Sequence, residues 1–203
     1  MHIGLDFDNT VALYDRVFHR RALADGLIPP GTAVNKRAVR DAIRALPDGD
    51  RSWTELQGLV YGRLMDEAEA APGIDRFLLA CREAGARVSI ISHKTEFPAI
   101  GERVSLRDAA RSWIGRQGFT PRFGVAAADI AFVGTQDEKI RRIGRAGCTH
   151  FVDDLVEVLG RPDFPRGVER ILYDPARAGA PPAGVLAFAS WAQIRTHLFG
   201  AAR

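Results

Sequence analysis

The feature that most constrains the fold is a regular alternation of short apolar runs with amphipathic stretches. Six apolar runs have the length of buried strands: 3–7, 87–91, 130–134, 150–152, 170–174 and 185–189. Helical periodicity marks four further segments: 75–85, 106–118, 137–147 and 190–200. Buried strands that alternate with helices form parallel sheets covered on both faces, with right-handed crossovers. The pattern therefore predicts an α/β fold built on a parallel sheet.

One stretch, residues 14–71, interrupts this alternation. It contains no convincing strand, only helical patterns at about 15–25, 35–46 and 52–69. A segment of this length is too long for an ordinary crossover. We expect a helical cap over 14–71, inserted after the first strand of a core domain that comprises 1–13 and 72–203.

Composition narrows the class of protein. The chain has 203 residues, 46% hydrophobic and 26% charged, with no apolar run long enough for a membrane helix and no secretory signal pattern. Cys81 and Cys148 lack metal-ligand spacing, so we expect buried, reduced thiols in a cytoplasmic protein. A net charge of +3 is too small to require a nucleic-acid partner and leaves room for an anionic small molecule.

Polar residues gather where the predicted strands end, and that edge of a parallel sheet is where sites form. The set is Asp6 and Asp8 after the first strand, Ser92, His93 and Lys94 after the second, Asp153 and Asp154 after the fourth, and Lys139 on the helix before it. Carboxylates, a hydroxyl and an ammonium together suit the binding of phosphate. Only three of the 28 basic residues are lysines, which gives Lys94 and Lys139 some added weight.

These motifs, in this order, resemble the haloacid dehalogenase-like superfamily of hydrolases. The resemblance rests on "DFDNT" (6–10), a strand-terminal Ser92, Lys139 and the "DD" pair at 153–154. The helical insert is similar to the cap of the C1-capped phosphatase subgroup. The resemblance implies a Rossmann-like core whose first strand is central, flanked by the strands that end at Ser92 and Asp153.

The resemblance also implies roles for the strand-end residues. Asp6 is the expected nucleophile, which forms an aspartyl-phosphate. Mg²⁺ is the expected cofactor, held by Asp6, Asp153 and the main-chain carbonyl of Asp8. Ser92 and Lys139 are expected to bind the phosphoryl group, with Lys139 neutralising charge on the nucleophile.

Four further residues are candidates for contact with the substrate. Backbone donors at Asn9 and Thr10 are expected to bind phosphoryl oxygens, and His93 and Lys94 to touch the substrate. Asp154 is expected to hold metal-bound water. Lys94 competes with Lys139 for the role of the phosphate-neutralising lysine.

Asp8 bears on the type of reaction. A carboxyl two residues beyond the nucleophile can protonate a leaving oxygen and then activate water. By the resemblance, dehalogenases lack this acid, because halide needs no proton. We therefore expect a phosphatase that acts on a small organic phosphate, such as a sugar phosphate or nucleotide. Transfer of the phosphoryl group to a sugar hydroxyl stays open, as does the oligomeric state.

Other interpretations of the motifs are weaker. "DFDNT" could be a polar turn after a strand, but the other motifs follow it in the expected order. An EF-hand loop is excluded, since Val11 and Val17 stand where Gly and Glu are required. The "IGRQG" (114–118) and "IGRAG" (143–147) stretches suggest a nucleic-acid-binding loop that opens a helix, whereas here both close one.

Overall fold

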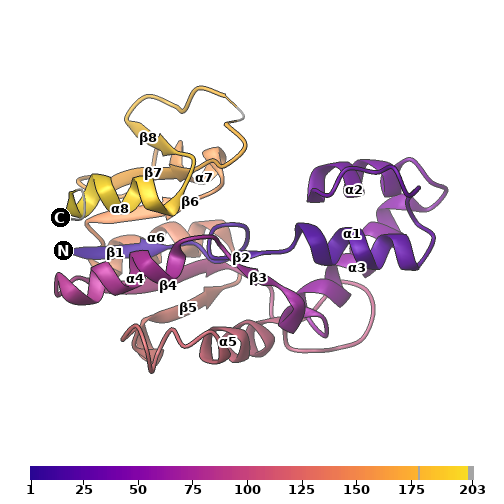
Figure 1. Cartoon of the computed structure of the whole chain (residues 1–203), viewed down its shortest axis with the longest axis horizontal. Helices are drawn as coiled ribbons and strands as arrows, with labels where there is room; N and C mark the ends of the chain where they lie inside the picture. Colours follow the sequence, from indigo (N-terminus) through magenta and orange to yellow (C-terminus); the bar gives the residue numbers. More distant parts are fainter. Residues whose placement is uncertain (178, 201–203) are drawn as a thin grey trace. The chain divides into compact units, whose positions relative to one another are not determined.

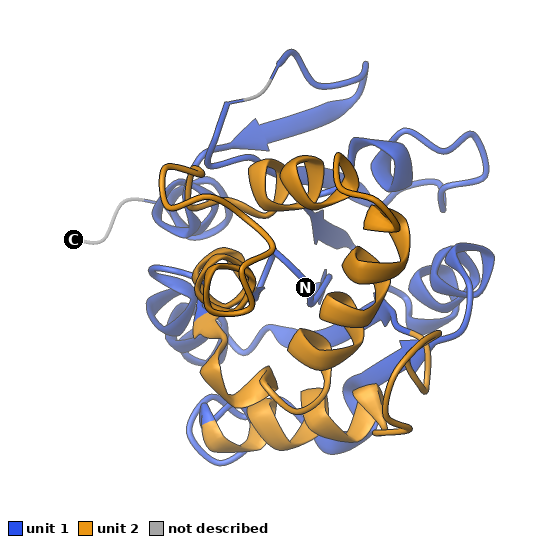
Figure 2. Cartoon of the chain, turned by 90° about the vertical axis from the view of Figure 1, so that its right-hand side faces the viewer, with its two compact units in different colours: residues 1–12, 70–94, 117–203 blue, residues 13–69, 95–116 orange. Residues whose placement is uncertain are grey.

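The computed structural model of the protein describes residues 1–177 and 179–200; residue 178 and residues 201–203, which the sequence assigned to the core, lie outside this description. The chain forms two compact units (Figure 2). Unit 1 comprises residues 1–12, 70–94 and the chain from 117 onward, and unit 2 comprises 13–69 with 95–116. The segment 95–116 was predicted as part of the core.

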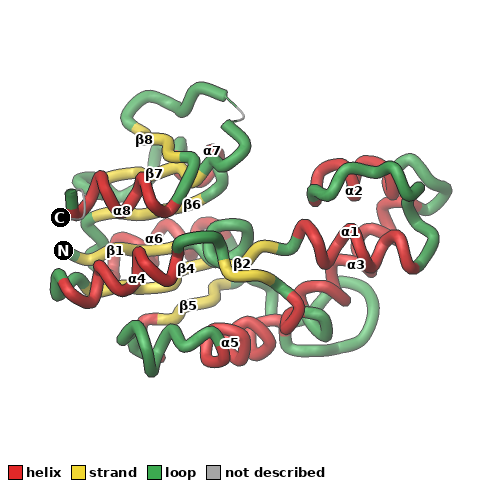
Figure 3. The backbone as a smooth tube through the Cα atoms, viewed as in Figure 1, coloured by secondary structure: helices red, strands yellow, loops and turns green. Residues whose placement is uncertain are grey.

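Unit 1 is built on a six-stranded sheet within the described residues (Figures 1 and 3). Its strands are β1 (His2–Leu5), β4 (Arg87–His93), β5 (Ile130–Val133), β6 (His150–Asp153), β7 (Glu169–Tyr173) and β8 (Val185–Phe188). The order is β5-β4-β1-β6-β7-β8, and every pair is parallel. The predicted parallel α/β fold is therefore confirmed, with β1 between the strands that carry Ser92 and Asp153.

Helices lie against both faces of this sheet. On one face α4 (Ile74–Glu83) and α8 (Trp191–Phe199) pack together, with the rings of Phe77 and Trp191 4.7 Å apart. On the other face α6 (Gln136–Ala146) and α7 (Val156–Leu159) bury an apolar cluster that includes Ile143 and Phe151. A short 3₁₀ turn, η2 (Ala127–Asp129), leads into β5.

Gly4 allows β1 to occupy the centre of the sheet. A Cβ atom at this position would come within 2.5 Å of the ring of Phe151, its neighbour on β6. The missing side chain thus makes room for an aromatic ring that is itself buried. Gly147, with φ +70°, ends α6 in the left-handed conformation that glycine adopts readily.

Unit 2 is helical. It contains α1 (Asp15–Ala24), α2 (Lys36–Arg44), α3 (Gly49–Tyr61), η1 (Met65–Glu67) and α5 (Leu106–Arg116). Its interior is aromatic, with the Phe18 and Trp53 rings stacked 5.0 Å apart. The Trp113 indole of α5 donates to the Ala68 carbonyl at 3.0 Å, which ties the 95–116 segment to this unit.

Two details of the predicted insert are wrong. The helix expected over 52–69 ends at Tyr61, because Gly62 leaves the helical conformation at φ −103° and ψ −97°. Residues 14–71 were expected to contain no strand, yet β3 (Glu69–Ala70) pairs with β2 (Ala12–Leu13) in a separate two-stranded sheet. Both strands are too short to show alternation in the sequence. Among the described residues, no helix combines the length and hydrophobicity needed to cross a membrane.

Candidate active site

The candidate site lies at the carboxyl edge of the sheet in unit 1, where β1 is flanked by β4 and β6. The chain runs outward from β1 to β4 and β5, then returns to β6 on the other side, so this is the point where the strand order reverses. Loops on the two sides of such a point diverge and leave room for a ligand. Asp6 follows β1 directly, and Asp153 is the last residue of β6.

A tight loop after β1 fixes the backbone of residues 6–12. The amides of Val11 and Ala12 donate to the Phe7 carbonyl at 3.0 and 2.9 Å, and Asn9 donates to the Ala12 carbonyl at 2.8 Å. Asn9 has φ +60°, a left-handed conformation that asparagine tolerates better than most residues. The "DNT" sequence therefore suits this turn.

The start of α6 places Lys139. Thr135 accepts from the Glu138 amide at 3.1 Å, and the Glu138 carboxylate accepts from the Gly134 and Thr135 amides at 2.8 and 3.2 Å. This reciprocal capping box fixes the first turn of the helix. Lys139 is the next residue, so its side chain extends from a backbone that the capping box fixes.

A buried lysine joins two aspartates at the centre of the site. Lys139 Nζ lies 2.5 Å from Asp6 Oδ1 and 2.6 Å from Asp153 Oδ2. The three residues expose 2%, 4% and 0% of their surface. Charges this deeply buried are stable only when they are paired and hydrogen-bonded, and here one ammonium serves both carboxylates.

Asp154 and Thr10 extend the network. Asp153 Oδ1 accepts from the Leu155 amide at 3.0 Å, and Thr10 donates to Asp154 Oδ1 at 3.4 Å. Asp6, Asp153 and Asp154 each place a carboxylate oxygen within 4.8 Å of the others. Three clustered carboxylates offer the oxygen ligands that Mg²⁺ prefers.

The protonation of this cluster reflects its burial. Burial raises the pKa of the Asp6 carboxyl to about 7, opposed by the Lys139 ammonium and assisted by the charge of Asp153. Burial acts to lower the pKa of Lys139, but the carboxylates of Asp6 and Asp153 outweigh it, so the net shift is upward. Lys139 is therefore a permanent cation in the site.

Asp8 is held by a different lysine. Lys94 Nζ lies 2.9 Å from Asp8 Oδ1 and 2.8 Å from Asp8 Oδ2, and the Lys94 side chain is 3% exposed against 21% for Asp8. The structure thus gives each candidate lysine its own carboxylates: Lys139 contacts Asp6 and Asp153, and Lys94 contacts Asp8.

The remaining predicted site residues, Ser92, Thr10 and His93, lie in different surroundings. Ser92 is buried near the end of β4, and Thr10 is buried beside Asp154. His93 Nε2 lies 3.0 Å from the Gly134 carbonyl, in the turn that follows β5.

Some residues that contact the candidate site could not be identified from the sequence. The Trp191 indole donates to the Thr10 carbonyl at 3.1 Å across 181 positions of the chain. The ring of Phe151 lies 5.6 Å from Lys139 Nζ, and that of Phe7 lies 5.6 Å from Lys94 Nζ. No local pattern reveals contacts between segments so far apart. The one available hint was the scarcity of lysine, since two of the three lysines are buried here.

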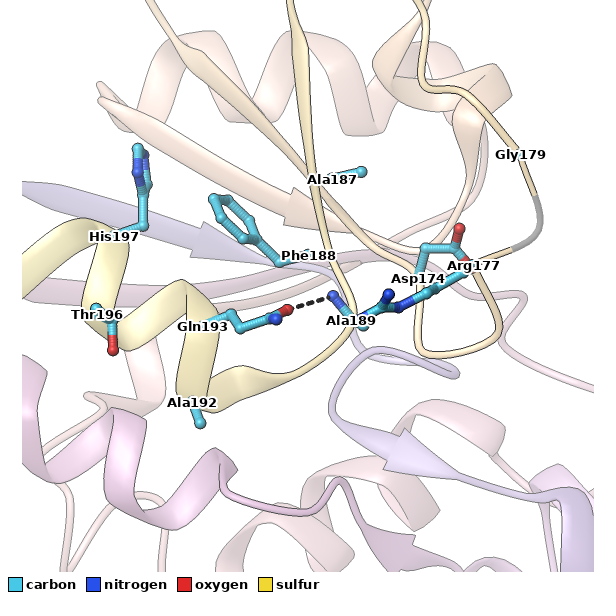
Figure 4. A pocket seen from close by; sticks show the side chains of 10 residues that line it. All are labelled: Asp174, Arg177, Gly179, Ala187, Phe188, Ala189, Ala192, Gln193, Thr196 and His197. Carbon is cyan, nitrogen blue, oxygen red and sulfur yellow. Dashed lines mark hydrogen bonds between the residues drawn. The ribbon is translucent and has the colours of Figure 1, made fainter.

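A cavity of about 690 Å³ lies elsewhere in unit 1, between β8, α8 and the chain that follows β7 (Figure 4). Its lining includes Asp174, Arg177, Phe188, Gln193 and His197, and Gln193 accepts from the Ala189 amide at 2.9 Å. Asp6, Asp153 and Asp154 are not among the residues that line it. The cavity is therefore a separate feature from the candidate active site.

Several solved structures share this architecture. A hydrolase of haloacid dehalogenase (HAD) subfamily IA from Geobacter sulfurreducens matches with a TM-score of 0.60 at 12% identity, over 97% of this chain and 95% of that one. The D,D-heptose 1,7-bisphosphate phosphatase from Burkholderia thailandensis matches with a TM-score of 0.56 at 13% identity, over 98% and 99%. The fold is that of the haloacid dehalogenase-like hydrolases.

A third structure shows that the fold alone does not fix the chemistry. An L-2-haloacid dehalogenase matches with a TM-score of 0.55 at 14% identity, over 97% of both chains. Neither the models of protein families nor the curated protein sequences match this chain. The choice between phosphate and halide chemistry must therefore come from the site residues.

Proposed function

We propose that this protein is a Mg²⁺-dependent hydrolase of phosphomonoesters, in which Asp6 attacks phosphorus and becomes an aspartyl-phosphate. The observation that carries the proposal is the buried contact of Lys139 with both Asp6 and Asp153 at the carboxyl edge of the sheet. A paired acid at this position has a nucleophilic oxygen, a neighbouring cation and a fixed orientation.

Charge explains why Asp6 needs these neighbours. A carboxylate that approaches a phosphate dianion is repelled by about 1–4 kcal/mol per charge pair at 4 Å, depending on the surrounding dielectric. Lys139 offsets part of this repulsion, because its ammonium is fixed beside Asp6 before the substrate arrives. Ser92 and the Thr10 amide are the proposed donors to the phosphoryl oxygens; the Asn9 amide, also expected in this role, donates to the Ala12 carbonyl instead.

The residues present fit a magnesium ion. Asp6, Asp153 and Asp154 are clustered carboxylates, and the cluster contains no sulfur or imidazole ligand that would favour a softer metal. Mg²⁺ would be held by Asp6, Asp153 and the main-chain carbonyl of Asp8, with Asp154 orienting its water. When bound, Mg²⁺ supplies positive charge in addition to that of the Lys139 ammonium.

Asp8 favours phosphatase chemistry over dehalogenation. The leaving oxygen of a phosphomonoester requires a proton, and the acyl-phosphate that remains requires an activated water. Asp8 has a partly exposed carboxyl two residues from the nucleophile and can serve both steps in turn. A halide leaves without a proton, so a dehalogenase has no use for this group.

We propose that residues 14–71 act as a C1-type cap and select the substrate. A helical cap suits a small organic phosphate, such as a sugar phosphate or a nucleotide, better than a phosphoprotein. Cys81 and Cys148 are free and buried, as expected of a protein that works in the reducing cytoplasm.

A phosphate-release screen tests the proposal. Purified protein is incubated with phosphorylated metabolites and p-nitrophenyl phosphate, with Mg²⁺ or with EDTA. We expect Mg²⁺-dependent release that Asp6→Asn abolishes, whereas Asp75→Asn, an exposed residue at the start of α4, retains it. Release that Asp6→Asn leaves unchanged contradicts the proposal.

The same preparation distinguishes the other candidate reactions. Chloride release from 2-chloropropionate, without phosphate release, would indicate a dehalogenase. A second phosphorylated sugar among the products from a sugar monophosphate would indicate transfer to a hydroxyl instead of to water.

A further inference from the structure

The ion pair of Asp8 with Lys94 differs in kind from a surface salt bridge. Lys94 Nζ is nearly equidistant from the two carboxylate oxygens, at 2.9 and 2.8 Å, and its side chain is 3% exposed. A donor shared by both oxygens restricts the rotation of the carboxylate as well as its position. Exposed pairs, by contrast, are mobile and contribute little.

Both partners start from fixed backbone. The Lys94 amide donates to the Val133 carbonyl at 2.9 Å, which continues the pairing of β4 with β5. Asp8 lies in the loop that the Phe7 carbonyl closes through its bonds to Val11 and Ala12. The ring of Phe7 also lies 5.6 Å from Lys94 Nζ. Lys94 is therefore held in a fixed position beside Asp8, whose side chain otherwise has three staggered rotamers available.

We propose that Lys94 is the positioning residue of Asp8, holding this acid in the rotamer from which it exchanges protons with the substrate. This inference rests on the proposed function, and it assigns to Lys94 a role separate from the binding of phosphate. Lys139 already neutralises the nucleophile Asp6, so Lys139 acts on the nucleophile and Lys94 acts on the acid, Asp8.

The proton steps define what Lys94 acts on. As the bond between phosphorus and the ester oxygen breaks, Asp8 gives its proton to that oxygen, and the alcohol leaves. Asp8 then takes a proton from the water whose oxygen attacks phosphorus, which releases phosphate and regenerates the Asp6 carboxylate. Lys94 neither gains nor loses a proton in either step.

The inference can be tested with two substrates that differ in how strongly their hydrolysis depends on a proton donor. Phenyl phosphate has a more basic leaving group than p-nitrophenyl phosphate, so its hydrolysis depends more on protonation by Asp8. Lys94→Met keeps the side-chain length but removes the donors, and we expect kcat to fall at least about tenfold on phenyl phosphate and less than about threefold on p-nitrophenyl phosphate. Lys94→Gln keeps a donor and should fall between wild type and Lys94→Met.

Asp8→Asn provides the comparison. It should show the same dependence on the leaving group, with a larger loss of about 10²-fold or more on phenyl phosphate. The double variant Asp8→Asn with Lys94→Met should be no slower than Asp8→Asn alone, because a positioning residue has no effect once its target is gone. Thermal unfolding of each variant checks that the fold is retained.

Three results would overturn the inference. They are an equal loss on both substrates, a higher KM with unchanged kcat, which marks Lys94 as a phosphate ligand, and multiplied losses in the double variant. If wild-type protein hydrolyses neither these two substrates nor any phosphorylated metabolite of the screen described above, the proposed function itself fails. A crystal structure of Lys94→Met then decides the positioning role, since an Asp8 side chain that has not moved refutes it and a displaced one supports it.

Discussion

At Lys139 a single buried ammonium compensates two buried carboxylates. Lysine suits this position because its compact charge can lie between two acids, whereas the planar fork of arginine is matched to one. The chain uses arginine for most of its basic residues, so a lysine here reflects the geometry of the site. The aromatic face of Phe151 beneath Nζ completes the environment.

Removal of this ammonium should destabilise the protein. Lys139→Met leaves Asp6 and Asp153 buried without a cation, and we expect the free energy of unfolding to fall by about 3–5 kcal/mol in metal-free buffer. Urea denaturation measures the difference. The control is Arg141→Met, an exposed residue of the same helix, which should change stability by less than about 0.5 kcal/mol. Similar losses in both variants would mean that the buried pairs contribute no stability.

At the scale of elements, β1 depends on polar contacts as well as apolar ones. His2 Nε2 lies 2.7 Å from Ser89 Oγ on β4, and both residues are buried. Burial lowers the pKa of His2, and the charge of Arg87 acts in the same direction, so folding favours the neutral form of His2. In the unfolded chain a histidine has a pKa of about 6.5.

This difference predicts a pH-dependent contribution of His2 to stability. Because the folded pKa is lowered, the contribution is fully present above about pH 6.5 and declines as the unfolded chain binds a proton below it. Wild type should therefore exceed His2→Gln in free energy of unfolding by more at pH 8 than at pH 5, as measured in urea. A difference that does not vary with pH would show that His2 does not titrate between the two states.

The sequence predicted the strands better than the ends and surroundings of some helices. Apolar runs followed by acids placed Asp6 and Asp153 at strand ends, because burial on both faces leaves a continuous hydrophobic signal. That these two strands are neighbours was implied by the resemblance alone, and the strand order confirms it. It overextended α3 past Gly62, where one glycine ended an otherwise helical pattern. Periodicity over 106–118 showed that one face of a helix is buried but not that α5 packs within unit 2.

The candidate site was predictable in its residue types and less so in its pairings. The motifs "DFDNT" and "DD" named the acids, and the resemblance pointed to Lys139 on the helix before β6, with Lys94 as the competitor. The contact of Lys94 with Asp8 joins residues 86 positions apart, and it depends on side-chain geometry that periodicity does not encode. The separate roles proposed for Lys94 and Lys139 came only from the structure.

At the scale of the whole molecule, metal binding should raise stability. An ion that binds only the folded state stabilises it by about 2.7 kcal/mol at a concentration a hundredfold above Kd. For a chain of this length that corresponds to an increase in Tm of roughly 5–10 °C. We expect Mg²⁺ to raise Tm in wild type and in Asp163→Asn, an exposed residue paired with Arg161, but not in Asp153→Asn. An increase that Asp153→Asn retains would place the ion elsewhere.

The central claim, that Asp6 forms a covalent bond to phosphorus, can be tested by chemical trapping. Borohydride reduces an aspartyl-phosphate to homoserine, which mass spectrometry locates by residue. Protein quenched during turnover of p-nitrophenyl phosphate with Mg²⁺ should carry homoserine at position 6, and protein quenched without substrate should carry aspartate there. Turnover that leaves Asp6 unmodified, or that modifies another residue, would contradict the account.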